Sequence, residues 1–186
     1  ELAWQHDGSE YEATLAVRVP ATPARLQRST GRIGPEGLLP LRFSERTRSE
    51  EAAHFDREGG RIVFSGNRVP VALERGAQDR LSVLLQLSAL LAGDPSRSAE
   101  ARRLVLQAAG ARDADRWELV VEGVEELALP GGNVTGTKVS RAPRHEYDTR
   151  LEVWFGPGPA YGPVRLRLTW PHGDWLDLQW SGTDKR

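Results

Sequence analysis

The segment ERGAQDRLSVLLQLSALLAGDP, residues 74–95, constrains the fold more than any other part of the sequence. Residues 78–92 are helix formers without Gly or Pro, Gly93 follows as a C-cap, and Pro95 blocks continuation. The pattern predicts one long apolar helix over about 77–92. Its six leucines cover more than one amphipathic stripe. A helix that is apolar on most sides must be surrounded by other parts of the protein.

Most of the remaining sequence predicts short strands separated by turns rich in Gly and Pro. The predicted strands are 11–19, 25–33, 38–48, 52–56, 61–65, 68–73, 102–108, 116–124, 126–129, 134–140, 151–155, 164–170 and 175–180. The simplest arrangement is a curved antiparallel sheet, forming a β-roll or incomplete barrel, wrapped around the helix. We therefore predict a mainly β (α+β) fold in which residues 1–186 form a single β-roll domain.

The last two predicted strands can be aligned residue by residue. A three-residue loop, 171–173, puts Leu168 opposite Leu176 and Leu166 opposite Leu178. On the other face the same register puts Arg167 opposite Asp177 and Arg165 opposite Gln179, and Gly173 supplies the left-handed residue that such a loop requires. Val164, Trp170 and Trp180 are expected on the apolar face.

The helix supports two interpretations, which periodicity does not separate. In the first, Leu84, Leu87 and Leu91 line a solvent-open groove for an acyl chain or another apolar ligand. In the second, the helix plugs the sheet and leaves no cavity. Each fully buried leucine would contribute about 1.5–3 kcal/mol in either case.

Four further residues are candidates for binding. Arg75, Asp79 and Arg80 cluster at the predicted helix start, where they would bind an anion together with the free helix amides. The alternative is that they cap the helix and pair with neighbouring strands. Trp175 is out of phase with the core face and is a candidate for a contact surface.

Catalytic and metal chemistry find little support. The chain has no cysteine, and His6, His54, His145 and His172 have no partner at metal-ligand spacing. No serine lies in a nucleophile elbow and no glycine run matches a phosphate loop. We predict no enzyme activity, no metal and no cofactor.

The sequence also limits partners. A net charge of −1 gives no field that would attract nucleic acid. No apolar stretch reaches the roughly 18 residues of a transmembrane helix, so no transmembrane segment is expected in this chain. Because Met is absent even at position 1, we expect that a signal peptide or another segment precedes the sequence.

Six segments occur in an order that resembles the bacterial domain of unknown function family 3108. They are WQHDGSEYEATL (4–15), STGRIGPEGLLPLRF (29–43), AAHFD (52–56), GAQDRLSVLLQLSALL (76–91), EVWFGPGPAYGPVRLRLT (152–169) and HGDWLDL (172–178). The resemblance implies an exported cell-envelope protein of Gram-negative bacteria, located in the periplasm. It also implies a β-rich roll or incomplete barrel, broadly like carriers that handle lipoproteins, with no assigned activity.

Two functions follow as expectations. The first is a non-enzymatic binding module for a lipid, another apolar ligand or a component of the cell envelope. The second is a structural or protein-interaction module that has a filled core and binds an envelope protein through its surface or an open sheet edge.

Overall fold

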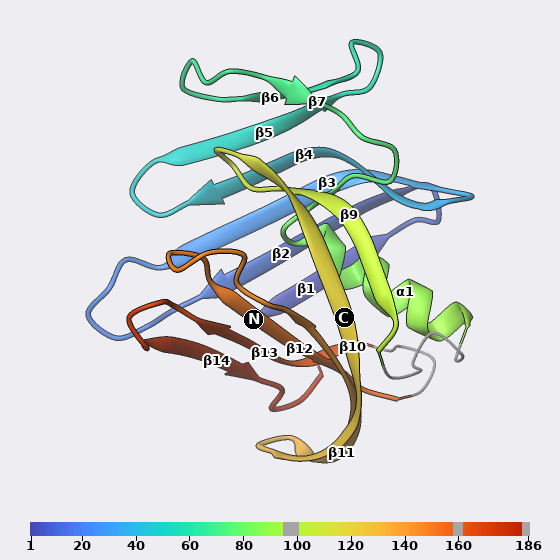
Figure 1. Cartoon of the computed structure of the whole chain (residues 1–186), viewed down its shortest axis with the longest axis vertical. Helices are drawn as coiled ribbons and strands as arrows, with labels where there is room; N and C mark the ends of the chain where they lie inside the picture. Colours follow the sequence, from blue (N-terminus) through green and yellow to red (C-terminus); the bar gives the residue numbers. More distant parts are fainter. Residues whose placement is uncertain (95–100, 158–161, 184–186) are drawn as a thin grey trace. The chain divides into compact units, whose positions relative to one another are not determined.

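The chain forms two sheets and one helix in the part that the structure describes. The structure is a computed structural model that describes residues 1–94, 101–157 and 162–183 (Figure 1). The chain divides into two compact units, of which unit 1 comprises Glu1–Gln86 and Leu106–Trp117, and unit 2 comprises Leu87–Val105 and Glu118–Arg186.

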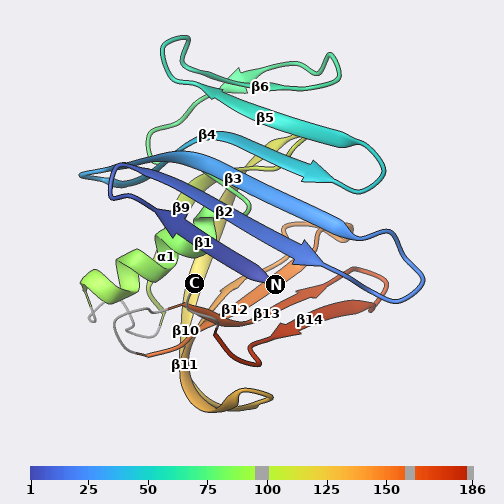
Figure 2. The same cartoon turned by 180° about the vertical axis from the view of Figure 1, so that it is seen from behind.

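The first sheet belongs to unit 1 and is antiparallel throughout. Its seven strands lie side by side in sequence order (Figures 1 and 2). They are β1 (Leu2–His6), β2 (Glu10–Val17), β3 (Arg25–Gly34), β4 (Gly37–Arg46), β5 (Glu50–Asp56), β6 (Arg61–Phe64) and β7 (Val71–Ala72). Strand β1 was not predicted, because its five residues next to the chain end form too short a pattern.

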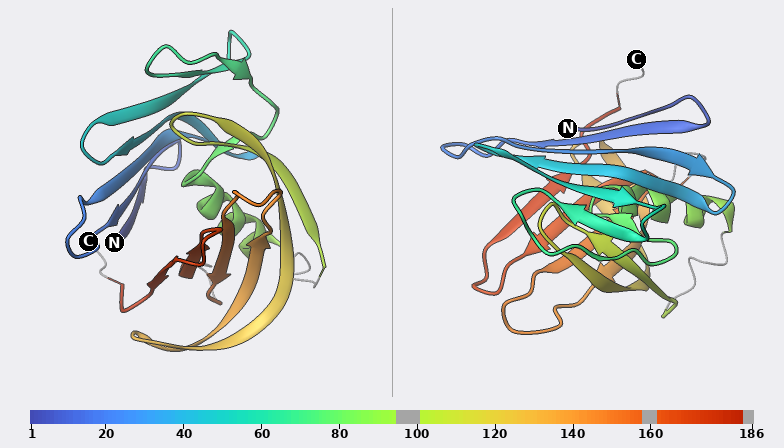
Figure 3. Two further views of the ribbon diagram at one scale, coloured as in Figure 1. Left: turned by 60° about the vertical axis from the view of Figure 1, so that its left-hand side comes forward. Right: turned by 90° about the horizontal axis from the view of Figure 1, so that it is seen from above.

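The second sheet contains one parallel pair and is otherwise antiparallel. In spatial order it runs β14-β13-β12-β11-β10-β9-β8, and its strands in unit 2 curve like part of a barrel wall (Figure 3). The strands are β8 (Gln78–Asp79), β9 (Arg103–Ala109), β10 (Ala114–Leu129), β11 (Gly132–Arg141), β12 (Arg150–Phe155), β13 (Pro163–Thr169) and β14 (Trp175–Gln179).

Strand β10 replaces two predicted strands, 116–124 and 126–129. The register against β11 shifts between Val121 and Gly123, and Gly123 has φ +110°. A bulge therefore keeps one strand continuous where the sequence suggested a break. The glycine is the signal for this bulge.

The helix is shorter than predicted. Helix α1 spans Ser82–Gly93, so the prediction of one long apolar helix over about 77–92 is wrong. Gln78 and Asp79 instead pair in parallel with Ala108 and Ala109 as β8. The cause is the pairing with β9: Asp79 ends the short strand that this pairing forms, and its side chain then takes up the first free amides of the helix.

The mainly β prediction is confirmed, although the strands form two sheets rather than one. No helix in the described ranges is both long and apolar enough to cross a membrane. Pro95, which was expected to end the helix, lies outside the described residues.

The predicted register of the last hairpin is confirmed. Leu166 pairs with Leu178 and Leu168 with Leu176, while Arg167 pairs with Asp177 and Arg165 with Gln179. Gly173 has φ +93°, as the three-residue loop required.

Two residues leave the predicted apolar face of this hairpin. The register between β12 and β13 shifts after Trp154. Val164 and Trp180 pack instead against a separate cluster formed by Leu127, Leu129 and Trp154. A second bulge therefore redirects Val164, which sequence alternation alone cannot detect.

The bulge at Gly31 gives a test of the packing in unit 1. The β3–β4 register shifts between Thr30 and Gly31, and a Cβ at Gly31 would lie 2.3 Å from the Leu39 carbonyl oxygen and 2.8 Å from Tyr11 Cε1. We expect Gly31→Ala to lower the free energy of unfolding by about 1–3 kcal/mol, because backbone cannot yield as a side chain does. Urea unfolding measures the effect.

The control for this prediction is Gly93→Ala, because a Cβ at Gly93 meets nothing within 4 Å. That variant should match or slightly exceed the stability of the wild type. Equal stability of the two variants would contradict the close approach at Gly31.

Candidate functional site

A fully buried carboxylate lies at the start of α1. Asp79 is 0% exposed, and its Oδ1 accepts hydrogen bonds from the backbone amides of Leu81 (2.9 Å) and Ser82 (2.7 Å). The Ser82 hydroxyl in turn accepts a bond from the Asp79 amide at 2.9 Å. Asp79 and Ser82 thus form a reciprocal cap that sets where the helix begins.

The other carboxylate oxygen of Asp79 binds the first sheet. Ser29 on β3 donates its hydroxyl to Asp79 Oδ2 at 2.6 Å, and the Tyr11 hydroxyl on β2 lies 3.1 Å from Ser29 Oγ. Trp4 on β1 stacks on the Tyr11 ring at a centroid separation of 5.2 Å. One hydrogen-bonded chain therefore connects the helix start to β3 and β2.

Burial dominates the acid–base properties of this network. It raises the pKa of Asp79 to about 6, while the bonds from Ser29, Ser82 and Leu81 act in the opposite direction. Burial, together with the nearby Asp79 carboxylate, also raises the pKa of the Tyr11 phenol. Hydrogen bonds thus offset only part of the effect of burial, and ionisation of Asp79 above its pKa lowers the free energy of unfolding.

Two glutamines attach the same region to β4. Gln78 donates its side-chain amide to the Leu38 carbonyl at 2.8 Å, and Gln86 accepts from the Leu38 amide at 2.7 Å. Both backbone groups of Leu38 are therefore satisfied by side chains from β8 and α1.

Unit 2 carries a partly exposed apolar surface on its last hairpin. We call Leu166, Leu168, Leu176 and Leu178 the leucine face, because these paired residues share one side of β13 and β14. All four are partly buried. The neighbouring strand β12 adds Leu151 opposite Leu168 and Val153 opposite Leu166, and these two are buried. Burial therefore decreases toward β14.

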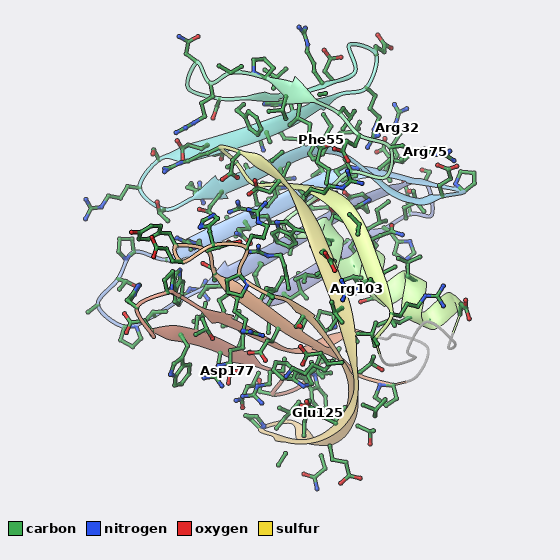
Figure 4. The ribbon with its side chains drawn as sticks, in the orientation of Figure 1. Arg32, Phe55, Arg75, Arg103, Glu125 and Asp177 are labelled. Atoms are coloured by element: carbon green, nitrogen blue, oxygen red, sulfur yellow. The ribbon has the colours of Figure 1, made fainter. Side chains whose placement is uncertain are left out.

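The opposite face of these strands is charged and aromatic. The Trp154 ring lies between Lys138 Nζ and the Arg165 guanidinium, at 5.2 and 4.8 Å from its centroid, and donates its indole N–H to Glu125 at 2.7 Å. Arg165 also binds Asp177 at 2.5 Å; Figure 4 labels Glu125 and Asp177. Trp154 is thus buried beneath charged side chains.

A shallow depression of about 500 Å³ lies on unit 1 beside the β1–β2 turn. It is lined by Gln5, His6, Asp7, Glu10, Tyr11, Glu12, Thr30, Gly31 and Leu41. Two of its carboxylates are already engaged, since Asp7 accepts bonds from Ser9 and Glu10, and Glu12 pairs with Arg28. Within the described ranges, no group of three or more His, Asp or Glu is placed to hold a metal ion.

Comparison with known proteins identifies the family. A family model described as "Protein of unknown function (DUF3108)" matches residues 1–177. The chain belongs to this family. No curated protein matches the chain.

One solved structure is similar to this DUF3108 chain. It is a beta-barrel-like protein of a different domain of unknown function, DUF1849, from Brucella abortus. The two chains are 14% identical, with a TM-score of 0.50 over 94% of this chain and 81% of that chain. At this identity the likeness shows the fold alone.

The structure separates the candidate anion-binding residues of the DUF3108 chain. Arg75, which lies between β7 and β8 and is labelled in Figure 4, pairs with Glu36, and Arg80 pairs with Asp113. Asp79 turns away from solvent and caps the helix. All three residues thus have protein partners, and the partners of Arg75 and Arg80 lie in the connections between strands.

The apolar candidates are placed differently from one another. Leu84, Leu87 and Leu91 are 3%, 1% and 1% exposed. Trp175 is 59% exposed, with the Arg167 guanidinium 5.1 Å from its ring centroid. The sequence analysis found the leucine face through the hairpin register but did not single it out as a binding surface.

The buried Asp79 carboxylate predicts a pH dependence of stability. Because its folded pKa is raised above its unfolded value, its contribution to stability is complete below pH 4 and is lost as the pH rises through about 6. Asp79→Asn stays neutral and should remove this loss, which is worth roughly 3 kcal/mol. Urea unfolding of both proteins between pH 4 and 8 measures the difference.

Asp148→Asn is a control of opposite sign. Hydrogen bonds from Arg141 and Arg144 lower the pKa of Asp148, so its contribution is present above pH 4 and is lost in acid. This variant should therefore be weakest relative to the wild type at neutral pH. If Asp79→Asn and the wild type changed in parallel with pH, the carboxylate would not be buried as described.

Proposed function

We propose that this DUF3108 protein is a non-enzymatic binding module that holds an apolar ligand, such as an acyl chain, on the leucine face. The observation that carries the proposal is the partial exposure of four in-register leucines at the end of a curved sheet. Soluble proteins rarely leave such contiguous apolar surface open unless it binds something.

The burial gradient favours this place over the helix. Leu84, Leu87 and Leu91 are already covered by protein, so a ligand would have to displace packed side chains to reach them. On β13 and β14 the ligand would cover surface that is partly in water, and the buried Leu151 and Val153 would support it from the side. The ligand site is thus moved from the predicted helix groove to the hairpin.

The absence of enzyme activity is also a proposal. Its support is the state of the unusual groups in the described residues: Asp79 is inaccessible, and Lys138 lies within 4 Å of Glu122, Glu125 and Glu152. A catalytic centre requires titratable groups that converge on an open cleft.

We further propose that the protein works in the periplasm or cell envelope of Gram-negative bacteria, after export by an N-terminal segment. The family resemblance of the sequence supports this location. A fusion of the full-length gene to alkaline phosphatase, which is active only after export, should give active reporter. An inactive but intact fusion protein would contradict the location.

A second candidate function is a protein-interaction module. The specific observation in its favour is the open edge of β14 together with the exposed Trp175. Aromatic side chains beside an unpaired strand edge suit recognition of another chain.

Binding of cis-parinaric acid tests the apolar site. We expect Leu176→Gln and Leu178→Gln each to raise the dissociation constant of the probe about tenfold, because each removes on the order of 1.5 kcal/mol of apolar contact. Fluorescence titration of the folded variants measures the affinity.

The matched control is Val105→Gln on β9, an exposed apolar strand residue outside the leucine face that is 53% exposed. It should bind the probe like the wild type. A wild type that does not bind, or equal losses in all three variants, would contradict an apolar site on the leucine face.

A further inference from the structure

Among the described residues, the last strand of the second sheet leaves one row of its backbone groups without a partner strand. The Trp170 amide donates to the Asp174 carbonyl and the Trp180 amide to the Val164 carbonyl, both at 2.8 Å. Residues 174 and 180 thus direct their backbone groups toward β13, and by alternation 176 and 178 do the same. The backbone groups of Trp175, Asp177 and Gln179 therefore point to the free edge.

Strand β14 lacks the usual protection of an edge. Its sequence, WLDLQ, contains no Pro, Gly or Lys, and its register against β13 has no bulge. Its one charge, Asp177, is turned toward Arg165, and the side chain is 8% exposed. By contrast, the terminal strands β7 and β8 have only two residues each.

The sequence of β14 is complementary to itself about its centre. In an antiparallel pair centred on Asp177, Leu176 faces Leu178 of the second strand and Trp175 faces Gln179, so apolar side chains meet on one face. The equally long terminal strand β1, LAWQH, has no such match, because pairing about Trp4 puts Leu2 opposite His6.

We propose that β14 pairs antiparallel with β14 of a second copy of this chain, about a two-fold axis through Asp177. Trp175, Asp177 and Gln179 then exchange backbone hydrogen bonds with Gln179, Asp177 and Trp175 of the second copy. Such an interface is isologous and closes as a dimer. The second sheet of one copy then joins the second sheet of the other, and the leucine faces of the two copies become continuous.

The charges at the axis are compatible with this pairing. Two Asp177 carboxylates would repel if they faced each other directly. Each, however, accepts bonds from Arg165 Nε at 2.9 Å and Nη2 at 2.5 Å within its own chain. Arg167, which pairs with Asp177 across the hairpin, adds a second positive charge on the same face.

The dimer does not rest on the proposed ligand site. Its hydrogen bonds come from the backbone groups of Trp175, Asp177 and Gln179, and its contact of Leu176 with Leu178 across the axis needs no ligand, whereas an apolar ligand would cover the exposed side of the leucine face. Failure to bind cis-parinaric acid would therefore leave the dimer standing, and a monomeric protein would leave the ligand site standing.

Gln179→Pro tests the edge without breaking the hairpin. Proline removes an amide that points to the open edge and none that binds β13, so the subunit should fold with the circular dichroism and melting of the wild type. Gln179→Ala keeps the amide. By native mass spectrometry at micromolar concentration, we expect the wild type and Gln179→Ala to be dimers and Gln179→Pro to be a monomer. A monomeric wild type, or a dimeric Gln179→Pro, would overturn the proposal.

Cysteine cross-linking tests the register. The chain has no cysteine, so Leu176→Cys and Leu178→Cys each introduce a single thiol. These positions form a non-hydrogen-bonded pair with Cα atoms about 4.5 Å apart, within the range of a disulfide. Under mild oxidation, the mixture of the two variants should cross-link at least about tenfold faster than either variant alone. Equal rates in all three samples would overturn the proposed register.

Discussion

The buried carboxylate of Asp79 is the interaction on which the arrangement of unit 1 depends. It ends β8, begins α1 and binds β3 through Ser29, with the Tyr11 hydroxyl next in the chain. A buried charge without a cation costs free energy, which three hydrogen bonds only partly offset. An apolar residue would fill the space but could not satisfy the amides of Leu81 and Ser82. The Asp79 carboxylate therefore fixes where the helix starts, at a cost in free energy. Gln78 and Gln86, which bond to Leu38, attach the same region to β4.

In unit 2, both faces of the strands carry large side chains, and the two faces are covered in different ways. On one face the leucines and valines pack together. On the other, Trp154 is buried beneath Lys138 and Arg165, which are neutralised by Glu122, Glu152 and Asp177. The charged ends of both cations lie over the indole ring and also pair with carboxylates. A sheet covered in this way on one face needs no further layer there, which leaves the leucine face as the surface with unsatisfied apolar area.

Sequence reasoning succeeded where a single local rule decided the outcome. The β13–β14 register followed from strict alternation on two strands and one left-handed glycine, and the structure has the predicted pairs. Prediction from the sequence failed where helix propensity and strand pairing competed for the same residues. In the segment around Asp79, helix-forming residues suggested a helix from about 77, but the parallel pairing of β8 with Ala108 and Ala109 prevailed. A pairing partner thirty residues away in the sequence leaves no mark on the helical pattern.

The candidate site could be predicted from the sequence only in part, because its position depends on more than local patterns. Apolar periodicity marked the helix leucines as important, and they are buried, but periodicity measures apolarity and not exposure. The leucine face has the same residue type and a regular pattern, but its four leucines are only partly buried. These leucines lie on the last two strands of the second sheet, a position that depends on the whole strand order. Bulges add to the difficulty, since the one between Pro163 and Arg165 moves Val164 to the Trp154 side.

Strand β14 separates two kinds of contact by alternation. Leu176 and Leu178 direct their side chains to the leucine face and their backbone groups to β13. Trp175, Asp177 and Gln179 direct their side chains to the charged face and their backbone groups to the open edge. Apart from the contact of Leu176 with Leu178 across the axis, an apolar ligand and a second copy would therefore contact different atoms of these five residues, so neither excludes the other. In a pair centred on Asp177 the leucine rows of the two copies adjoin, and an apolar chain lying across the axis would contact leucines of both. Ligand binding and pairing would therefore favour each other. A bound ligand would cover apolar surface next to the axis, and pairing would cover apolar surface next to the ligand.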